Sequence, residues 1–356
     1  MHFSPEFSFV AECCRSTFGG SEMRPQLSLR MLDGERVVRL ARFHGVQGLV
    51  WRAVGVDEEG AHGELDRLRS DAATIAASNL KVAAECGNIL ADFERAGIKL
   101  IFLKGLTLGA LAYGSAVVKS AVDADLLIAP NEISRAVTLL EDRGYILTIP
   151  NRPVAKVGQW HRVRKESVWV SPHSGVQLDL HTRVADNPRL IPAIGAHSPK
   201  RLVDIGNGIA LPTLGPVETF AYLAVHGASS AWFRLKWICD FAALIADKSP
   251  TELDELYRSS QRLDAGRASA QALLLADRIF GSLANNSALK NELLAQKANS
   301  LLYRAAMKQL AGRPDPIEPT SRPLGTMRIH WTQFLLMPGL AFKTSELVRQ
   351  AKSALA

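Results

Sequence analysis

Two aspartates, Asp123 and Asp125, have the spacing needed to hold a divalent cation. They begin a short apolar segment, residues 122–128, that we expect to be a strand. Side chains two residues apart on a strand point to the same face, so the two carboxylates converge. Hard divalent ions take oxygen ligands and commonly bridge carboxylates to substrate phosphates. Taken alone, such a pair more often marks a solvated strand end, but other features favour a site for Mg²⁺ or Mn²⁺.

A third aspartate, Asp179, belongs to a later predicted strand with alternating character. Leu178 and Leu180 share one face of this strand, while Gln177, Asp179 and His181 share the other. If the two strands are neighbours, Asp179 joins the first carboxylate pair. Three carboxylates would form a two-metal site, which activates an attacking hydroxyl and neutralises a leaving pyrophosphate. His181 is then either a nucleotide contact or a hydrogen-bonded structural histidine.

A phosphate-binding turn is expected at Lys104-Gly105, directly after the predicted buried strand of residues 98–103. Glycine lets the backbone approach a phosphate, the following helix N-terminus supplies N–H donors, and the lysine adds positive charge. Gly114-Ser115 is an alternative turn with a tolerable spacing to the aspartates. We prefer Lys104-Gly105 because it follows a strand directly.

The elements that must position these residues predict an α+β (mixed α/β) fold. We expect an N-terminal helical region over residues 1–97, a small mixed-sheet α/β core over 98–212 and a C-terminal helical domain over 213–356. Helices are expected over residues 27–32, 35–43, 66–96, 106–113, 130–142, 217–228, 231–246, 253–263, 267–280, 284–310 and 340–355, strands over 98–103, 122–128 and within 160–184, and loops over 313–316 and 319–323.

Composition restricts the class of protein. The chain of 356 residues has 42 Lys+Arg against 35 Asp+Glu, a net charge of +7 that suits nucleotide phosphates but also serves general solubility. The four cysteines show neither a disulfide framework nor a zinc pattern, which indicates a reducing compartment. The sequence has no signal-peptide pattern and no apolar run long enough for a bilayer. We therefore expect a cytoplasmic protein without a membrane partner.

The order of these motifs resembles the polymerase-β-type nucleotidyltransferase superfamily. More closely, the chain resembles the bacterial "uncharacterised nucleotidyltransferase" family, in which a hydrophobic-Leu-Lys-Gly motif replaces the usual Gly-Ser. The resemblance covers roughly residues 75–300. Its matching stretches are Phe102-Leu103-Lys104-Gly105, Lys119, Asp123–Ile128, Gly144-Tyr145, Gln177–His181, His226 and Arg234–Asp240.

The resemblance implies transfer of a nucleoside monophosphate from an NTP, with ATP favoured, to a hydroxyl or phosphate acceptor. Asp123 and Asp125 would hold both metals, and Asp179 would hold the catalytic metal and help deprotonate the acceptor. The implied nucleotide contacts are Lys104, Gly105, Lys119, Lys236 and His181.

The chain departs from the family pattern at two positions, and one of the implied nucleotide contacts has an alternative explanation. The family usually has Arg at position 119 and commonly Glu at position 179, where this chain has Lys119 and Asp179. Lys236 also stands four residues before Asp240, the spacing of an ordinary surface ion pair.

The acceptor is left open between a small molecule, a peptide or protein, and RNA. Nucleic acid is not favoured, because Trp160-His161-Arg162 is only a weak basic-aromatic signal. The rival function is that of a non-catalytic nucleotide-binding or assembly partner that retains the fold.

Overall fold

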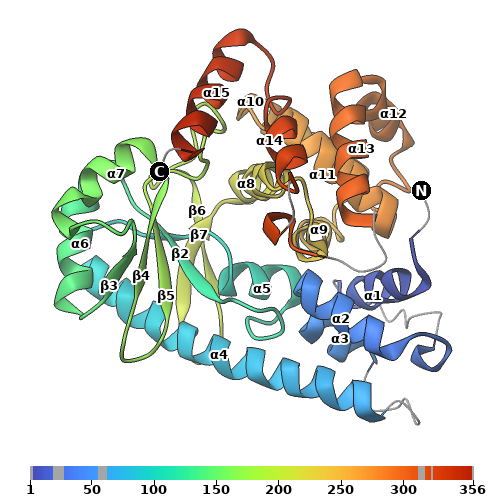
Figure 1. The fold of residues 1–356 in the computed structure, drawn as a ribbon, viewed down its shortest axis with the longest axis horizontal. Helices are drawn as coiled ribbons and strands as arrows, with labels where there is room; N and C mark the ends of the chain where they lie inside the picture. Colours follow the sequence, from blue (N-terminus) through green and yellow to red (C-terminus); the bar gives the residue numbers. More distant parts are fainter. Residues whose placement is uncertain (1–2, 19–27, 55–61, 312–316, 322–323, 355–356) are drawn as a thin grey trace. The chain divides into compact units, whose positions relative to one another are not determined.

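The computed structural model describes residues 3–18, 28–54, 62–311, 317–321 and 324–354 (Figure 1). The chain divides into two compact units. We call Thr74–Thr219 the sheet unit, and Met1–Ala73 together with Phe220–Ala356 the helical unit. A mixed sheet in the one and helices in the other confirm the predicted α+β class. The domain boundaries expected at 97/98 and 212/213 stay a prediction.

The sheet unit is built on five strands in the order β1-β2-β5-β4-β3. The central pair, β2 and β5, is parallel, and every other pairing is antiparallel. The strands are β1 (Ile101–Phe102), β2 (Asp123–Leu127), β3 (Ile146–Ile149), β4 (Glu166–Val170) and β5 (Gln177–His181).

One face of this sheet carries the core of the unit. Leu126 of β2 and Leu178 and Leu180 of β5 are fully buried there, against apolar side chains of α4 (His62–Arg95) and α6 (Ile133–Asp142). Because side chains alternate along a strand, the residues between these leucines point to the opposite face. The sheet unit also contains α5 (Leu106–Tyr113), α7 (Val157–Val163) and the short 3₁₀ turns η2 (Pro130–Glu132) and η3 (Val154–Lys156).

Three strands of the described structure were not predicted from the sequence. β3 is an exposed edge strand, and β6 (Lys200–Asp204) and β7 (Ala210–Leu214) form a separate two-stranded ribbon. β6 is charged and mostly exposed and β7 contains Pro212, so neither shows the apolar alternation by which strands are detected. The Thr213 hydroxyl donates to the Phe102 carbonyl at 2.6 Å, which fixes β7 beside β1.

Other expectations needed correction. The segment expected to begin an antiparallel strand at Trp160 is helix α7, whose Val157 and His161 are buried one turn apart. The strand expected over residues 98–103 is only β1, because Ile98 still donates to Phe93 in the helix-ending turn. The helix expected over residues 284–310 is two helices, α12 (Ser287–Ala295) and α13 (Lys297–Ala311). The loop predicted at residues 313–316 lies outside the described residues.

The helical unit contains the remaining elements, except that residues 216–219 at the start of α8 (Pro216–Ser229) belong to the sheet unit. Many begin with a side-chain cap, as at Ser249, which forms a reciprocal capping box with Glu252 at the start of α10. Among the described helices of the protein, none is both long and apolar enough to cross a bilayer. The bounds are α1 (Pro5–Arg15), η1 (Leu29–Met31), α2 (Gly34–His44), α3 (Gln47–Val54), α8 (Pro216–Ser229), α9 (Leu235–Leu244), α10 (Pro250–Arg262), α11 (Gly266–Phe280), η4 (Pro319–Ser321), α14 (Met327–Gln333) and α15 (Leu340–Ala354).

Candidate metal and nucleotide site

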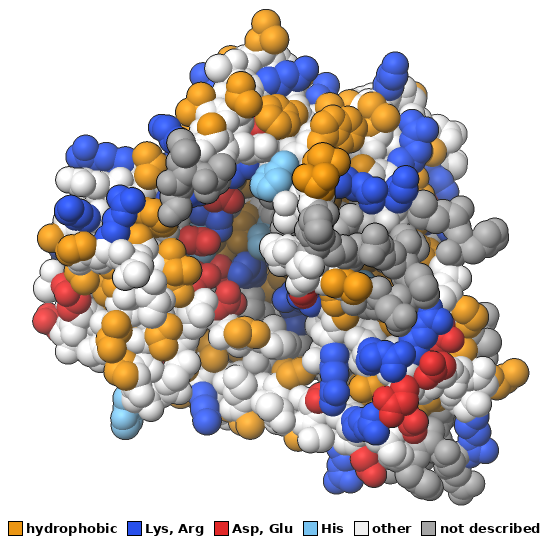
Figure 2. Space-filling view, viewed as in Figure 1, with side chains coloured by type: hydrophobic (Ala, Val, Ile, Leu, Met, Phe, Trp, Pro, Cys, Tyr) orange, Lys and Arg blue, Asp and Glu red, His pale blue; other side chains and the backbone are white. Residues whose placement is uncertain are grey.

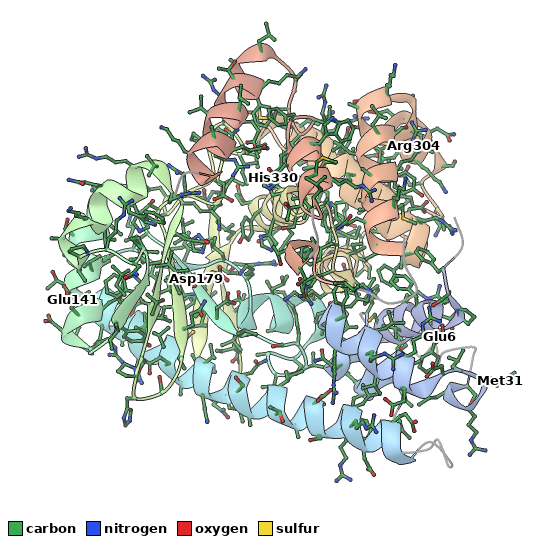
Figure 3. All side chains as sticks on the ribbon, viewed as in Figure 1. Glu6, Met31, Glu141, Asp179, Arg304 and His330 are labelled. Carbon is green, nitrogen blue, oxygen red and sulfur yellow. The ribbon has the colours of Figure 1, made fainter. Side chains whose placement is uncertain are left out.

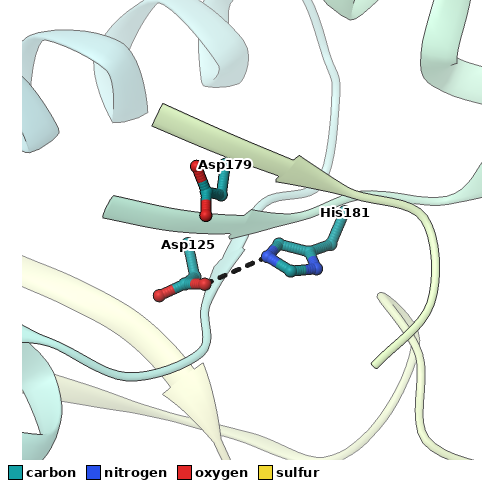
Figure 4. Close-up of side chains that lie close together, drawn as sticks. All are labelled: Asp125, Asp179 and His181. Carbon is teal, nitrogen blue, oxygen red and sulfur yellow. Dashed lines mark hydrogen bonds and ion pairs between the residues drawn. The ribbon is translucent and has the colours of Figure 1, made fainter. Parts of the chain in front are cut away.

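The parallel pairing of β2 and β5 brings together residues that lie more than fifty positions apart in the sequence. Asp125 is the register partner of Asp179, and Asp123 is the partner of Gln177. The core leucines point to one face, so these polar side chains share the other (Figure 3 labels Asp179 on β5). In Asp125, Asp179 and His181, one potential ligand atom of each residue lies within 4.8 Å of the others (Figure 4).

Asp125 is the most enclosed member of the site, with only 3% of its surface exposed. One carboxylate oxygen pairs with the ammonium group of Lys104, and the other lies 3.0 Å from His181 Nε2. Burial alone would raise the pKa of this carboxyl, but the charge of Lys104 and the hydrogen bonds from His181 and Lys104 hold it well below its usual range. Asp125 is therefore an ionised, fully oriented carboxylate.

The pKa of the Asp179 carboxyl is shifted in the opposite direction. Burial, together with the charges of Asp125 and Asp123, raises its pKa to about 6, and a hydrogen bond from Gln177 Nε2 at 2.9 Å offsets the rise only in part. A carboxylate destabilised by its anionic neighbours is relieved by a cation placed among them. The two carboxylates, with an imidazole in reach, are a donor set that suits Mg²⁺ or Mn²⁺.

Asp123, the third predicted carboxylate, begins β2 one pleat before Asp125 and is half-buried. It acts on Asp179 through its charge but lies outside the close group of Asp125, Asp179 and His181. The structure thus brings Asp125 and Asp179 directly together and places Asp123 at their edge. Its role as a metal ligand stays a prediction.

The two candidate phosphate turns lie at opposite ends of α5. Gly105 is the N-cap residue, with φ 71° and ψ −119°, a conformation that side-chain-bearing residues rarely adopt. Gly114 is the left-handed C-cap residue of the same helix. A helix N-terminus presents N–H groups and a C-terminus presents carbonyls, so anion binding favours Lys104-Gly105.

Lys119 lies in the segment that connects α5 to β2, and a residue missed by the sequence analysis holds this segment. Asn79, buried on α4, donates to the carbonyls of Ala116 (2.9 Å) and Lys119 (2.6 Å) and accepts from the Ala121 N–H (3.0 Å). The only sequence signal was an amide within an alanine-rich apolar stripe. Lys119 itself is buried.

Glu166 was also missed, although it begins β4 directly opposite His181, the last residue of β5. Its Oε2 lies 3.4 Å from His181 Nδ1, and its carboxylate pairs with Lys165. Burial alone would raise the pKa of Glu166, but the charges of Lys165 and His181 lower it below its ordinary value. His181, which the sequence analysis assigned to the nucleotide, thus lies between two carboxylates and holds Asp125.

Lys236 belongs to α9 of the helical unit, where its side chain lies over Gly45. Its proposed contact with nucleotide stays a prediction. All four cysteines are free and buried, in agreement with the absence of a disulfide pattern.

Comparison with known proteins agrees with this geometry. No curated protein matches the chain. A family described as uncharacterised nucleotidyltransferase matches residues 31–281, which is well over half of the sequence and includes every candidate site residue. The chain therefore belongs to the uncharacterised nucleotidyltransferase family.

Proposed function

We propose that this protein transfers a nucleoside monophosphate from an NTP, with ATP favoured, to a hydroxyl or phosphate group of an acceptor. The observation that carries the proposal is the matched register of Asp125 and Asp179 on adjacent parallel strands. Family membership supports a nucleotidyltransferase-type function. In the reaction, an acceptor oxygen forms a bond to the α-phosphorus, the bond between that phosphorus and the bridging oxygen breaks, and pyrophosphate leaves.

Asp125 and Asp179 would hold a divalent cation, with Asp123 contributing at the edge of the group. When bound, such ions lower the pKa of an attacking hydroxyl and neutralise the charge of the leaving group. His181 keeps Asp125 oriented through the 3.0 Å contact at Nε2. Asp179, the register partner of Asp125, would lie beside the acceptor hydroxyl and accept its proton.

The phosphates of the NTP would meet Lys104, Gly105 and the N-terminus of α5. The N-cap residue of this helix provides no side-chain hydrogen bond, so the first N–H groups are suited to a phosphate. A lysine ammonium has three N–H donors, which allows Lys104 to contact Asp125 and a phosphate oxygen together.

The proposal is tested by incubating the protein with each α-³²P-labelled NTP and cell extract, with and without Mg²⁺ or Mn²⁺. We expect metal-dependent labelling of an acceptor, strongest with ATP, that is lost in Asp179→Asn. A protein that binds ATP with unchanged affinity in EDTA and labels nothing would instead be a non-catalytic nucleotide-binding partner.

A further inference from the structure

Residues 143–165, which we call the basic segment, have an unusual charge pattern. They contain six Lys and Arg residues and no Asp or Glu, although Asp142 and Glu166 stand directly on either side. The segment runs from the end of α6 through β3 and α7 to the start of β4. Figure 2 shows Lys and Arg side chains gathered where Figure 1 places α7.

Only part of this charge is neutralised within the protein. Arg143 pairs with Glu85 and Asp92, and Lys165 pairs with Glu166.

Arg152, Lys156 and Arg162 are exposed, and none of the three forms an ion pair with the described residues. Arg164 is half-buried beside them. Three solvent-facing cations without a local acid create a positive surface that suits a polyanion.

An aromatic side chain stands within this surface. The guanidinium carbons of Arg164 and Arg152 lie 5.5 Å and 6.0 Å from the centre of the Trp160 ring. Guanidinium groups bind phosphates through two parallel hydrogen bonds, and aromatic rings stack on bases. This combination distinguishes a single-stranded nucleic acid from an acidic peptide, which offers carboxylates but no bases.

Hydrogen bonds attach the basic segment to the candidate site. Trp160 Nε1 donates to the Glu166 carbonyl at 2.7 Å. The ring nitrogens of buried His161 each lie 3.0 Å from a hydroxyl oxygen, one of Thr182 and one of Ser167. Thr182 directly follows His181, so α7 is held against the strand ends that carry Glu166 and His181.

The site itself is acidic and repels a polyanion, so the phosphates of such an acceptor need a binding surface just beyond the carboxylates. On the basis of the function proposed above, we infer that the acceptor is a single-stranded polynucleotide held by Arg152, Lys156, Trp160, Arg162 and Arg164. Its terminal hydroxyl attacks the α-phosphorus of the NTP, a new phosphodiester bond forms, pyrophosphate leaves, and the hydroxyl proton passes to Asp179. The single nucleotide thus joins the end of the strand.

The test measures binding of a short fluorescent single-stranded RNA by anisotropy over a range of salt concentrations. In the first variant Arg152, Lys156 and Arg162 are all changed to Gln. The matched control changes Lys81, Lys99 and Lys200 to Gln, three exposed lysines of the same unit. If each basic-segment cation contacts one phosphate, the slope of log K against log salt becomes shallower by about 2 in the first variant. The control keeps the wild-type slope.

A second pair of variants tests the aromatic contact. Trp160→Leu weakens RNA binding by about 5- to 150-fold, since base–aromatic stacking is lost, whereas Trp160→Phe retains most of the affinity. Inorganic polyphosphate, which has charge but no bases, binds both variants equally. The same measurements with single-stranded DNA show which polymer binds more tightly. The inference is supported if either polymer loses affinity with the triple change and with Trp160→Leu.

RNA and DNA binding that survives the triple change, or polyphosphate binding as sensitive to Trp160 as RNA binding, would overturn the inference. Calorimetry of ATP with the same triple variant separates this failure from failure of the proposed function. If the triple variant loses RNA binding but keeps the wild-type ATP affinity, the change has affected the acceptor surface and not the nucleotide site.

Discussion

Asp125 and Asp179 face each other across the parallel pair β2–β5, and the protein gives them opposite titration behaviour. The pKa of Asp125 is held well below its usual range, whereas the pKa of Asp179 is raised to about 6. Neighbouring carboxylates whose pKa values are pushed apart commonly have different chemical roles. Without a bound metal, Asp125 therefore stays ionised over the ordinary pH range, whereas Asp179 gains or loses its proton near pH 6.

The raised pKa of Asp179 predicts that Asp179→Asn stabilises the metal-free protein at high pH. The folded-state pKa lies above the ordinary value, so this carboxyl costs no stability while it is protonated and costs stability as pH rises through about 6. We expect Asp179→Asn to exceed the wild type by about 1–3 kcal/mol at about pH 8, and to match it at about pH 4. Urea unfolding in EDTA measures both values. A variant less stable than wild type at the higher pH would make Asp179 a structural residue.

The same pKa predicts how metal binding depends on pH. A ligand that binds only the folded state stabilises it, by about 2.7 kcal/mol at a concentration one hundred times its Kd. Because a metal requires ionised Asp179, the rise in Tm with Mg²⁺ or Mn²⁺ should be large above pH 6 and small below it. In Asp179→Asn the rise should be much smaller at every pH. Thermal unfolding, with Mn²⁺ electron paramagnetic resonance as an independent readout, checks this; an equal rise in the variant would contradict it.

Local patterns predicted the central strands and their carboxylates well. The Asp123–Asp125 spacing and the alternation around Asp179 follow from the two-residue period of a strand. Which strands are neighbours depends on long-range pairing, so the Asp125–Asp179 register was only a possibility until the fold was known.

Glu166 and Asn79 had no such local signal. Glu166 acts through its contact with His181 on the neighbouring strand. Asn79 acts through its hydrogen bonds to the segment that contains Lys119. Both contacts depend on the fold and not on neighbouring residues in the sequence. The segment from Trp160 was predicted to belong to antiparallel strands, but it forms the end of α7. The helical turn places Arg164 beside Trp160, a contact that the strand prediction did not suggest.

The Lys104–Asp125 ion pair predicts a stability loss that metal relieves. Lys104→Ala leaves a buried carboxylate without its main cationic partner, and breaking a buried pair costs about 3 kcal/mol or more. A divalent cation supplies the missing charge, so the loss should shrink when Mg²⁺ is added. Chemical unfolding of wild type and Lys104→Ala, with and without Mg²⁺, measures this difference. Equal losses in both conditions would place the metal away from Asp125.

Asn79 predicts a loss of nucleotide binding that exceeds its effect on stability. Asn79→Ala leaves the N–H of Ala121 and two carbonyls without their partner, at a cost of about 1–3 kcal/mol. The freed segment contains Lys119, so ATP affinity should fall under conditions where the variant is folded. Asn299→Ala is the control, since Asn299 is also buried and its amide donates to the Leu293 carbonyl at 3.2 Å, in the helical unit. Equal ATP affinities in the two variants would make Asn79 purely structural.

The two glycines at the ends of α5 decide between the two phosphate turns. Gly105 and Gly114 both have positive φ, 71° and 66°, so alanine at either position adds backbone strain. Space is not the obstacle at either position. A Cβ at Gly105 would lie 3.5 Å from Ala121 Cβ and 3.6 Å from the Asp123 carbonyl oxygen, and a Cβ at Gly114 would meet nothing within 4 Å. Gly114, at φ 66° and ψ 17°, is in the left-handed helical region, so Gly114→Ala should lose about 1–2 kcal/mol of stability. Gly105, at ψ −119°, lies outside that region, so Gly105→Ala should lose more, about 3 kcal/mol.

The effects of the two changes on nucleotide binding should differ by more than this strain, because Gly105 begins the helix beside Lys104 and Gly114 ends it among carbonyls. We expect calorimetry to show ATP affinity reduced at least tenfold in Gly105→Ala, a loss of about 1.4 kcal/mol, and near wild type in Gly114→Ala. The reverse result would assign the phosphates to Gly114-Ser115.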